Sequence, residues 1–371
     1  MHITGIITEY NPFHNGHKHH IEETKKKTSC DLLINVMSGN FVQRGEPAIC
    51  DKWKRATKAI ENGCDIVIEL PFIYATQSAD SFAQGAIQCL RLAGVQDVVF
   101  GSETNDLDML YKLSEINTHD YKQYMKDGLS LIQAYTKHIG NIQANDILGI
   151  HYIKHLKETS IKPYTIQRTN QYHGEHIEPK IASATAIRKA FYNHISIEHA
   201  TCMADELTND FAMKHYYPYI QTLLCTLDKE YLSQLFLMDE GIENHLIKQA
   251  KQHHNFEDFL DACTSKRYTK SKIRRTLIHL MNQTTKKQVN TLPPLQHIRI
   301  LAFNDKGRKY LKELKKHVHI ASKFTQIPKI YRDMELKAAH VYAYPLNYEA
   351  KQSMLSSELQ SAIYIKTDKS L

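Results

Sequence analysis

The sequence predicts an α/β domain built on a parallel sheet with helices on both faces, followed by a mostly helical domain. Through about residue 192, short apolar runs alternate with amphipathic stretches, which is typical of βαβ units. Those runs are nearly continuous in Val, Ile and Leu, as expected of strands buried on both faces. The alternation then stops, and residues 197–281 carry long helix-like periodic stretches. The predicted domains are therefore residues 1–192 and 193–371.

The apolar runs of the first domain end at residues that favour turns. The second run gives way to Ser38-Gly39-Asn40, the third ends at Pro71 and the fourth at Gly101. We expect strands at residues 3–8, 31–37, 65–70, 96–100 and 164–167, and helices at residues 17–28, 51–62, 79–92 and 146–156.

Three further segments complete the order of elements. Residues 116–139 have a helical pattern and look inserted before the fifth strand. Residues 283–294 are polar, end in Pro293-Pro294 and read as a loop or subdomain joint. The apolar run Ile298–Phe303 predicts one more strand within the second domain.

The bulk composition is that of a cytosolic globular protein. Of the 371 residues, 42% are hydrophobic and 23% charged, and no apolar run approaches the ~20 residues that span a bilayer. The start of the chain lacks the features of a signal peptide. Seven scattered cysteines contain no C-x-x-C pair, so neither a zinc knuckle nor a disulfide framework is indicated. The net charge of +7 is compatible with a polyanionic partner.

The strongest motif runs from Thr8 to His17 (TEYNPFHNGH), directly after the first strand. In an open α/β sheet the ligand crevice lies beyond the carboxyl ends of the strands, and a helix N-terminus there attracts phosphate. Gly16 permits close backbone approach, while His14 and His17 can hydrogen-bond phosphate oxygens. The alternatives are an exposed histidine-rich helix start or a metal site. A metal is disfavoured because no cysteine joins the histidines and the nearest carboxylates have no familiar ligand spacing.

A second motif, Ser183-Ala-Thr185-Ala-Ile-Arg188, lies where a last strand is expected to give way to a helix. Its hydroxyls and N–H groups can face the same crevice, and Arg188 can clamp the β- and γ-phosphates. Taken alone, Ser183 is as well explained as an N-cap. The His-x-Gly-His and Ser-x-Thr-x-Ile-Arg motifs together resemble the nucleotidyltransferase superfamily, which includes class I aminoacyl-tRNA synthetases and pantetheine-phosphate adenylyltransferase.

Three longer blocks resemble one bacterial family, the tRNA(Met) cytidine acetate ligases, across essentially the whole chain. They are MSGNFVQRGEPAICDKWKRA (Met37–Ala56), DIVIELPFIYATQSADSFAQGA (Asp65–Ala86) and VVFGSE (Val98–Glu103). The resemblance implies a Rossmann-like nucleotidyltransferase that forms acetyl-adenylate from acetate and ATP, with Mg²⁺ expected on the phosphates. It further implies transfer of the acetyl group to N4 of the wobble cytidine of elongator tRNA(Met).

The family's functional residues carry over by position. The catalytic residues are expected to be His14, His17 and Arg188. ATP contacts are expected from Ile7, Thr8, Glu9, Tyr10, Asn11, Pro12, Phe13, His14, Asn15, Gly16, His17, Lys18, His19, His20, Gly101, Asn145, Arg168, Ser183 and Thr185.

Three of these positions also make physical sense taken singly. Gly101 ends the fourth strand, where a side chain would collide with a ribose or base. Asn145 is of the N-cap type and faces the crevice. Arg168 follows the fifth strand and can reach a phosphate or stack on adenine. The structural alternatives are a turn at Gly101, a simple helix cap at Asn145 and a solvated Arg168.

Two other loops follow predicted strands. Arg44, in the glycine-bearing loop after the second strand, is a candidate to face acetate, phosphate or the RNA backbone. Glu69-Leu70-Pro71, after the third, either holds the ribose or merely terminates the strand.

The helical domain contains one strongly basic stretch, residues 264–275, where cations neutralise RNA phosphates or form a solvated helix face. Arg308 and Lys309 are weaker candidates of the same kind. The predicted tRNA-binding residues are Lys266, Arg267, Tyr268, Lys270, Lys272, Arg274 and Arg275, with Tyr268 available to stack on a base.

Two other functions remain open on sequence alone. An adenylyltransferase of a small phosphorylated metabolite would leave the basic stretch without a role. An RNA-binding protein with a regulatory nucleotide site would bind ATP without releasing pyrophosphate. The acetate pocket, the tRNA identity elements, the oligomeric state and the acceptor of the cytidine amine proton are not indicated by the sequence.

Overall fold

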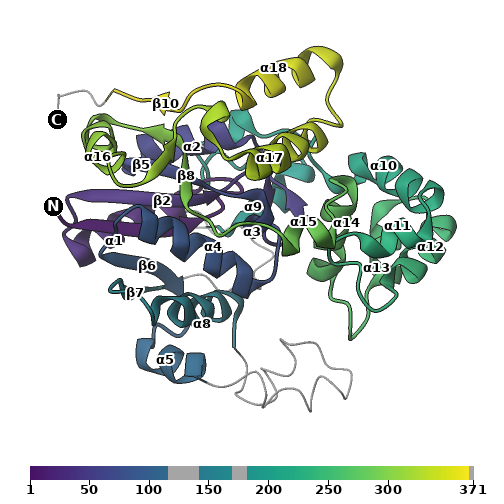
Figure 1. Cartoon of the computed structure of the whole chain (residues 1–371), viewed down its shortest axis with the longest axis horizontal. Coiled ribbons are helices and arrows are strands. Elements are labelled where there is room, and N and C mark those ends of the chain that lie inside the picture. Colours follow the sequence, from purple (N-terminus) through teal and green to yellow (C-terminus); the bar gives the residue numbers. More distant parts are fainter. Residues whose placement is uncertain (116–141, 169–181, 367–371) are drawn as a thin grey trace.

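The computed structural model describes residues 1–115, 142–168 and 182–366, and shows a mixed sheet flanked by helices with a helical unit at one side (Figure 1). The sheet has eight strands in the order β10-β8-β5-β2-β1-β6-β7, with β9 paired to β8. Its strands are β1 (Ile3–Thr8), β2 (Leu32–Ser38), β5 (Ile66–Leu70), β6 (Asp97–Ser102), β7 (Lys162–Gln167), β8 (His297–Phe303), β9 (His319–Ala321) and β10 (Ile363–Tyr364).

The five strands predicted in the first half of the chain are confirmed. β5, β2, β1, β6 and β7 are neighbours in that order and all run parallel. Their carboxyl ends therefore share one edge of the sheet, and the loops at that edge carry the predicted motifs. The helical pattern expected at residues 116–139 lies outside the described residues.

The predicted parallel sheet is extended by one antiparallel pairing, so the whole sheet is mixed. β8 joins the sheet beside β5 but runs antiparallel to it, with Ile68 opposite Ile300. β9 and β10 then pair parallel to β8. The apolar run at 298–303 indicates a strand, but its direction depends on how the chain returns from the helical region. Strands from beyond residue 192 thus complete the sheet, while the division of the chain into domains stays a prediction.

Helices cover both faces of the sheet. Ile21 of α1 and Trp53 of α2 pack on one face, and Phe82 of α4 and Ile153 of α8 belong to the cluster on the other. The apolar residues recur at helical spacing, so each helix buries one side. The helices of this part are α1 (Asn15–Thr28), α2 (Lys52–Glu61), α3 (Phe72–Ala75), α4 (Ala79–Leu92), α5 (Leu107–Glu115), α8 (Ala144–Leu156) and α9 (Ala184–Tyr192).

The chain then forms the helical unit and returns to the sheet (Figure 1). Across the described ranges, no helix is long and apolar enough to cross a membrane. The helical unit comprises α10 (Met213–Thr226), α11 (Lys229–Gln234), α12 (Ile242–Gln252), α13 (Phe256–Cys263), α14 (Lys270–Met281) and α15 (Lys286–Asn290). The returning segment adds α16 (Asp305–Leu314), α17 (Lys329–Tyr342) and α18 (Tyr348–Glu358).

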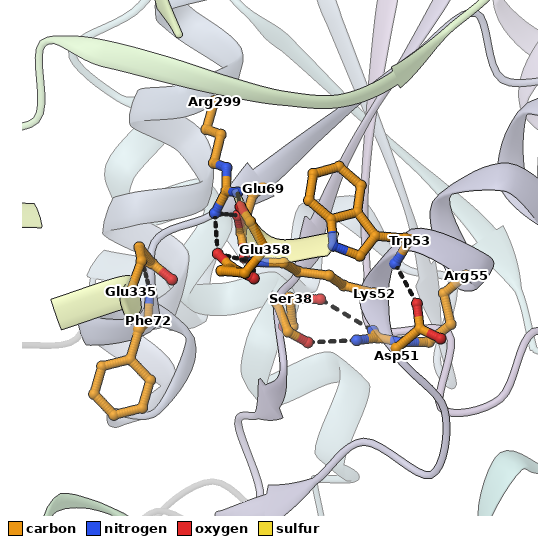
Figure 2. A network of polar contacts seen from close by, with 11 residues as sticks. Ser38, Asp51, Lys52, Trp53, Arg55, Glu69, Phe72, Arg299, Glu335 and Glu358 are labelled. Carbon is orange, nitrogen blue, oxygen red and sulfur yellow. Dashed lines mark hydrogen bonds and ion pairs between the residues drawn. The ribbon is translucent and has the colours of Figure 1, made fainter. Parts of the chain in front are cut away.

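A buried ionic network fastens the returning segment to the first half (Figure 2). Lys52 Nζ of α2 lies 2.6 Å from Glu69 Oε1 of β5 and 2.9 Å from the Glu358 carboxylate of α18. Arg299 of β8 contacts the same two carboxylates at 2.8 and 2.6 Å. Burial alone would raise the pKa of Glu69, but Lys52 and Arg299 hold it below its ordinary value. Glu69 is therefore an internal ion-pair partner in this structure.

Glu335 of α17 lies at the margin of that network. Its Oε1 accepts a hydrogen bond of 2.7 Å from the Phe72 N–H at the start of α3. Burial, with the charge of Glu69 added, raises the pKa of Glu335 to about 8. The raised pKa favours the protonated form of Glu335, and the other two carboxylates pair with the two cations.

Candidate active site

The turn between β1 and α1 (Asn15–Thr28) presents two stacked histidines at the helix N-terminus. His14 is the N-cap, and its Nδ1 accepts a hydrogen bond of 3.1 Å from Gly16 N–H. His17 Nδ1 accepts one of 3.3 Å from His14 N–H, and the ring centroids are 3.7 Å apart. Because each Nδ1 is an acceptor, each neutral ring carries its proton on Nε2. Both histidines therefore offer an Nε2–H donor.

Burial keeps these histidines uncharged. It lowers the pKa of His14 to about 3, with Arg168 and Arg188 adding to the effect. Burial also holds the pKa of His17 well below its ordinary value, with His14 and His20 contributing, and lowers that of His20 to about 4. At neutral pH the motif thus acts through hydrogen bonds and the helix terminus, while the nearby arginines carry the positive charge.

The second predicted motif meets the first in space. Ser183 caps α9, its Oγ accepting from Ala186 N–H at 3.1 Å, as the structural alternative expected. One turn later Arg188 donates from its NH1 nitrogen to the Asn11 carbonyl oxygen at 2.7 Å. Its NH2 nitrogen lies 3.5 Å from Glu46 Oε2. Thr185 is exposed on the first turn of the helix. Arg188 therefore lies beside the turn that carries both histidines.

Gly101, Asn145 and Arg168, which are far apart in sequence, gather around Glu103. A Cβ on Gly101 would lie 3.2 Å from Arg168 Cγ, so glycine leaves room for that side chain. Asn145 donates from Nδ2 to Glu103 Oε1, and its Oδ1 accepts from an Arg168 NH1 nitrogen at 3.5 Å. Arg168 Nε is 3.9 Å from Glu103. These residues form one polar cluster where the ends of β6 and β7 meet the first turn of α8.

The expected capping role of Asn145 is not what the structure shows. The N-cap of α8 is Gln143, which makes no side-chain capping bond, so Asn145 lies within the first turn. The carboxylate of Glu103 receives the N–H of Asp146 at 3.0 Å instead. The helix begins earlier than the capping preference of asparagine suggested, because an acidic residue from the β6 loop satisfies its N-terminus.

Glu103 and Asp146, whose carboxylates hydrogen-bond the loop after β6 to the start of α8, were not identified from the sequence. Asp146 is fully buried and accepts from Ser102 Oγ at 2.5 Å and from Thr104 N–H at 3.1 Å. These bonds hold the loop after β6 against the start of α8. A detectable indication was present, since Glu103 directly follows a buried strand and Asp146 opens a helical pattern.

Arg55 of α2 was also missed. It ties the first two loops together, and Figure 2 shows its contact with Ser38. Its side chain is fully buried and donates to the backbone carbonyls of Glu9 at 2.7 Å, Ser38 at 3.0 Å and Gly39 at 2.5 Å. Its Nε donates to the carbonyl of Cys50 at 2.9 Å. The carboxyl ends of β1 and β2 are thereby held in register around the site.

The loop predicted around Arg44 is a small hairpin, β3 (Phe41–Val42) and β4 (Glu46–Pro47). Gly45 has φ +76°, a conformation that glycine adopts readily. Gln43 N–H donates to Glu9 Oε1 at 2.7 Å, and burial raises the pKa of Glu9. The hairpin therefore packs directly on the turn that precedes α1.

The structure divides the basic stretch of the helical unit. Arg275 donates to the Gln43 carbonyl at 3.2 Å, and burial lowers its pKa to about 10. Arg274 pairs with Glu46. Both arginines thus face the hairpin of the first half of the chain.

The other four basic residues lie beside side chains of the helical unit or are exposed. These outer cations are Lys266, Arg267, Lys270 and Lys272. Lys272 Nζ is 4.9 Å from the Tyr268 ring centroid, and Lys266 is exposed. Arg267 pairs with Glu240 at 2.8 Å, and Lys270 pairs with Asp261. These four cations and Tyr268 remain available for the predicted RNA contact.

This chain is similar to known proteins over most of its length. A family model described as HIGH Nucleotidyl Transferase matches residues 1–358. The chain is 36% identical to the tRNA(Met) cytidine acetate ligase of Anoxybacillus flavithermus, covering 92% of this chain and 94% of that protein. It is 39% identical to the protein of the same name from Caldanaerobacter subterraneus, covering 86% and 88%.

Solved structures give the same result. Thermotoga maritima TmcAL in its apo form superposes with a TM-score of 0.87 and 28% identity, covering 99% of this chain and all of that one. A second crystal form of TmcAL, bound with alpha-thio ATP, superposes with a TM-score of 0.85 and 29% identity over the same share.

Proposed function

This chain belongs to the tRNA(Met) cytidine acetate ligase family, and from that membership we propose its reaction in two steps. In the first, acetate and ATP form acetyl-adenylate and pyrophosphate. In the second, the acetyl group passes to N4 of the wobble cytidine of elongator tRNA(Met), and AMP leaves. One observation above all supports this proposal: His14, His17 and Arg188 converge where β1 meets α1.

The first step needs in-line placement and neutralisation of charge more than covalent help. An acetate oxygen attacks the α-phosphorus, and the bond to the β-phosphate oxygen breaks. The Nε2–H groups of His14 and His17 donate to the phosphate oxygens on which charge develops. Arg188 neutralises the departing pyrophosphate. Mg²⁺ is expected to arrive with the nucleotide as part of the substrate.

The remaining ATP contacts are proposed from placement in the same region. Gly101, Asn145 and Arg168 surround Glu103 at the ends of neighbouring strands, where a nucleoside would lie beside the phosphate turn. Arg168 adds to the effect of burial in lowering the pKa of His14, which supports a role for its charge near the proposed phosphate site.

In the second step the cytidine amine attacks the acyl carbon of acetyl-adenylate. The bond to the AMP phosphate oxygen breaks, and the amine gives up one proton. The base has to reach a water-poor pocket, which we expect it to do turned out of its stack. The outer cations of the basic stretch, together with the partly exposed Arg274, are the proposed contacts for the RNA backbone.

The test is pyrophosphate release measured with ATP and a panel of carboxylates, with and without elongator tRNA(Met). We expect release with acetate, and acetylated cytidine only when the tRNA is added. Turnover of a small phosphate ester without RNA would instead support a metabolite adenylyltransferase. ATP binding with no pyrophosphate release would support a regulatory nucleotide site.

A further inference from the structure

The carboxylate of Glu46 contacts two arginines that are proposed to act in different steps of the reaction. One oxygen contacts Arg188 of α9, beside the histidine turn, at 3.5 Å. The other oxygen of the same carboxylate pairs with Arg274 of α14, in the helical unit. One side chain of the β3–β4 hairpin thus holds an arginine expected to bind ATP phosphates and another expected to bind RNA.

The hairpin has little freedom to withdraw from this position. A Cβ on Gly45 would lie 2.4 Å from Arg275 N and 2.6 Å from Arg274 C, so hairpin and helix touch backbone to backbone. Arg275 donates to the Gln43 carbonyl, and Gln43 N–H donates to Glu9. The hairpin therefore links the turn before α1 to helix α14 through a continuous series of contacts.

All three charged side chains remain within reach of solvent. The exposed fractions are 14% for Arg188, 20% for Glu46 and 26% for Arg274. A phosphate group can therefore compete with Glu46 for either arginine, since phosphate forms charge-assisted pairs of the same kind.

We propose that Glu46 is a positioning residue that makes ATP and tRNA binding oppose one another, because its single carboxylate is shared by Arg188 and Arg274. The inference rests on the proposed function. When ATP phosphates take Arg188, Glu46 has only Arg274 left and holds it more firmly. RNA then loses part of one phosphate contact.

Because Arg188 and Arg274 share the Glu46 carboxylate, adenylation is favoured before tRNA binding. After pyrophosphate leaves, Arg188 returns to Glu46, and Arg274 becomes easier for an RNA phosphate to take. The tRNA thus binds more tightly to the acetyl-adenylate form than to the ATP form. By linkage, bound tRNA weakens ATP binding by the same factor.

The experiment measures elongator tRNA(Met) affinity by fluorescence anisotropy at one salt concentration, with and without saturating α,β-methylene-ATP. In the wild type the analogue is expected to raise the Kd for tRNA by about three-fold, the scale of a partly exposed ion pair. Titrating the analogue with and without saturating tRNA should give the same factor. In Glu46→Gln the two tRNA Kd values should become equal.

Two further variants test the assignment. Arg274→Gln should also abolish the analogue effect, although it weakens tRNA binding overall. Glu240→Gln removes a carboxylate that pairs with Arg267 in the same basic stretch, and it should leave the three-fold effect unchanged.

The results of these measurements distinguish failure of the coupling between the ligands from failure of the proposed function. If the wild type binds neither the analogue nor tRNA, the proposed function fails and the coupling with it. If both bind independently, or the analogue effect persists in Glu46→Gln through direct repulsion between ligands, only the coupling is overturned.

Discussion

At the scale of single residues, the proposed chemistry of the site depends on which ring nitrogen of His14 and His17 carries the proton. His14 and His17 use their Nδ1 atoms to satisfy the first N–H groups of α1, which leaves Nε2–H on each ring as the donor. A capping residue of another type would satisfy the helix but offer no such donor. The same two residues therefore build the helix terminus and the proposed phosphate contact.

Removing either ring is expected to affect adenylation more than folding. His14→Ala or His17→Ala should reduce acetate-dependent pyrophosphate exchange by about 10²-fold, as expected for the loss of one transition-state donor. Circular dichroism and the midpoint of thermal unfolding should show a folded protein. His340→Ala, an exposed histidine of α17, is the matched control. Near wild-type exchange in both site variants would remove the motif from the mechanism.

Histidines whose pKa is lowered by burial should make the free energy of unfolding depend on pH. Burial lowers the pKa of His20, His279 and His297 to about 4, against 6.5 for an unfolded histidine. Below pH 6.5 the unfolded chain therefore binds more protons, and stability should fall until about pH 4. Each histidine contributes up to ~1.4 kcal/mol per pH unit in that window.

Urea unfolding at pH 7.5, 6.5 and 5.5 measures this dependence. His279→Asn removes one fully buried group, so its free energy of unfolding should fall less steeply between pH 6.5 and 5.5 than that of the wild type. The comparison uses the slope, since the substitution itself changes the absolute stability. Parallel slopes for the two proteins would contradict the assignment.

At the scale of elements, the contact between the β3–β4 hairpin and α14 joins the helical unit to the nucleotide site. Helix α14 packs closely only because Gly45 has no side chain and adopts φ +76°. Its first turns place Arg274 and Arg275 on the hairpin, while His279 packs against Phe72 of α3. This helix therefore contacts both the hairpin and the short helix α3 of the α/β part.

Gly45→Ala should destabilise the protein markedly. The new Cβ would meet backbone atoms at 2.4 and 2.6 Å, which cannot move aside as a flexible side chain does. Gly241→Ala is the matched control, because Gly241 has φ +77° but its Cβ would meet nothing nearer than 3.5 Å. We expect a loss of ~1 kcal/mol at Gly241 from backbone strain alone, and ~1–3 kcal/mol more at Gly45. Equal losses in urea unfolding would show that the contact is loose.

At the scale of the whole molecule, the chain leaves the sheet, forms the helical unit and comes back. The network of Lys52, Glu69, Arg299 and Glu358 closes that path, since its members come from both sides of the helical unit. The helical unit is thus anchored at two ends. In the proposed reaction, this anchoring keeps RNA that is held by the outer cations at a fixed place relative to the nucleotide site.

Neutralising the outer cations should separate the two steps of the reaction. With Lys266, Arg267, Lys270 and Lys272 changed to glutamine, acetyl-adenylate formation should persist and acetyl transfer should be lost. The slope of log affinity for tRNA against log salt should become shallower by roughly one unit per lost phosphate contact. Tyr268→Ala should weaken binding with little change in slope, since stacking releases no counterions.

The matched control uses two basic residues outside the stretch, Lys312 of α16 and Lys316 just beyond the end of that helix. Their double change to glutamine should alter neither acetyl transfer nor the salt slope. An unchanged slope in the fourfold variant, with transfer intact, would mean that the stretch is a solvated helix face.

The sequence by itself determined the elements and the motif at the site. Continuous apolar runs ended by Pro71 or Gly101 predict buried strands, because burial and turn chemistry are local properties. The His-x-Gly-His pattern after the first strand likewise predicts a phosphate site, since a helix N-terminus at a strand's carboxyl end attracts anions wherever it occurs.

Only the tertiary structure decided which distant residues meet. It turned β8 antiparallel to β5, gathered Gly101, Asn145 and Arg168 around Glu103, and set Arg55 among backbone carbonyls. It also divided the basic stretch, since the side of α14 that touches Gly45 depends on how the helical unit packs. Such outcomes follow from packing between segments far apart in the chain, and the spacing of residues along one segment carries no information about them.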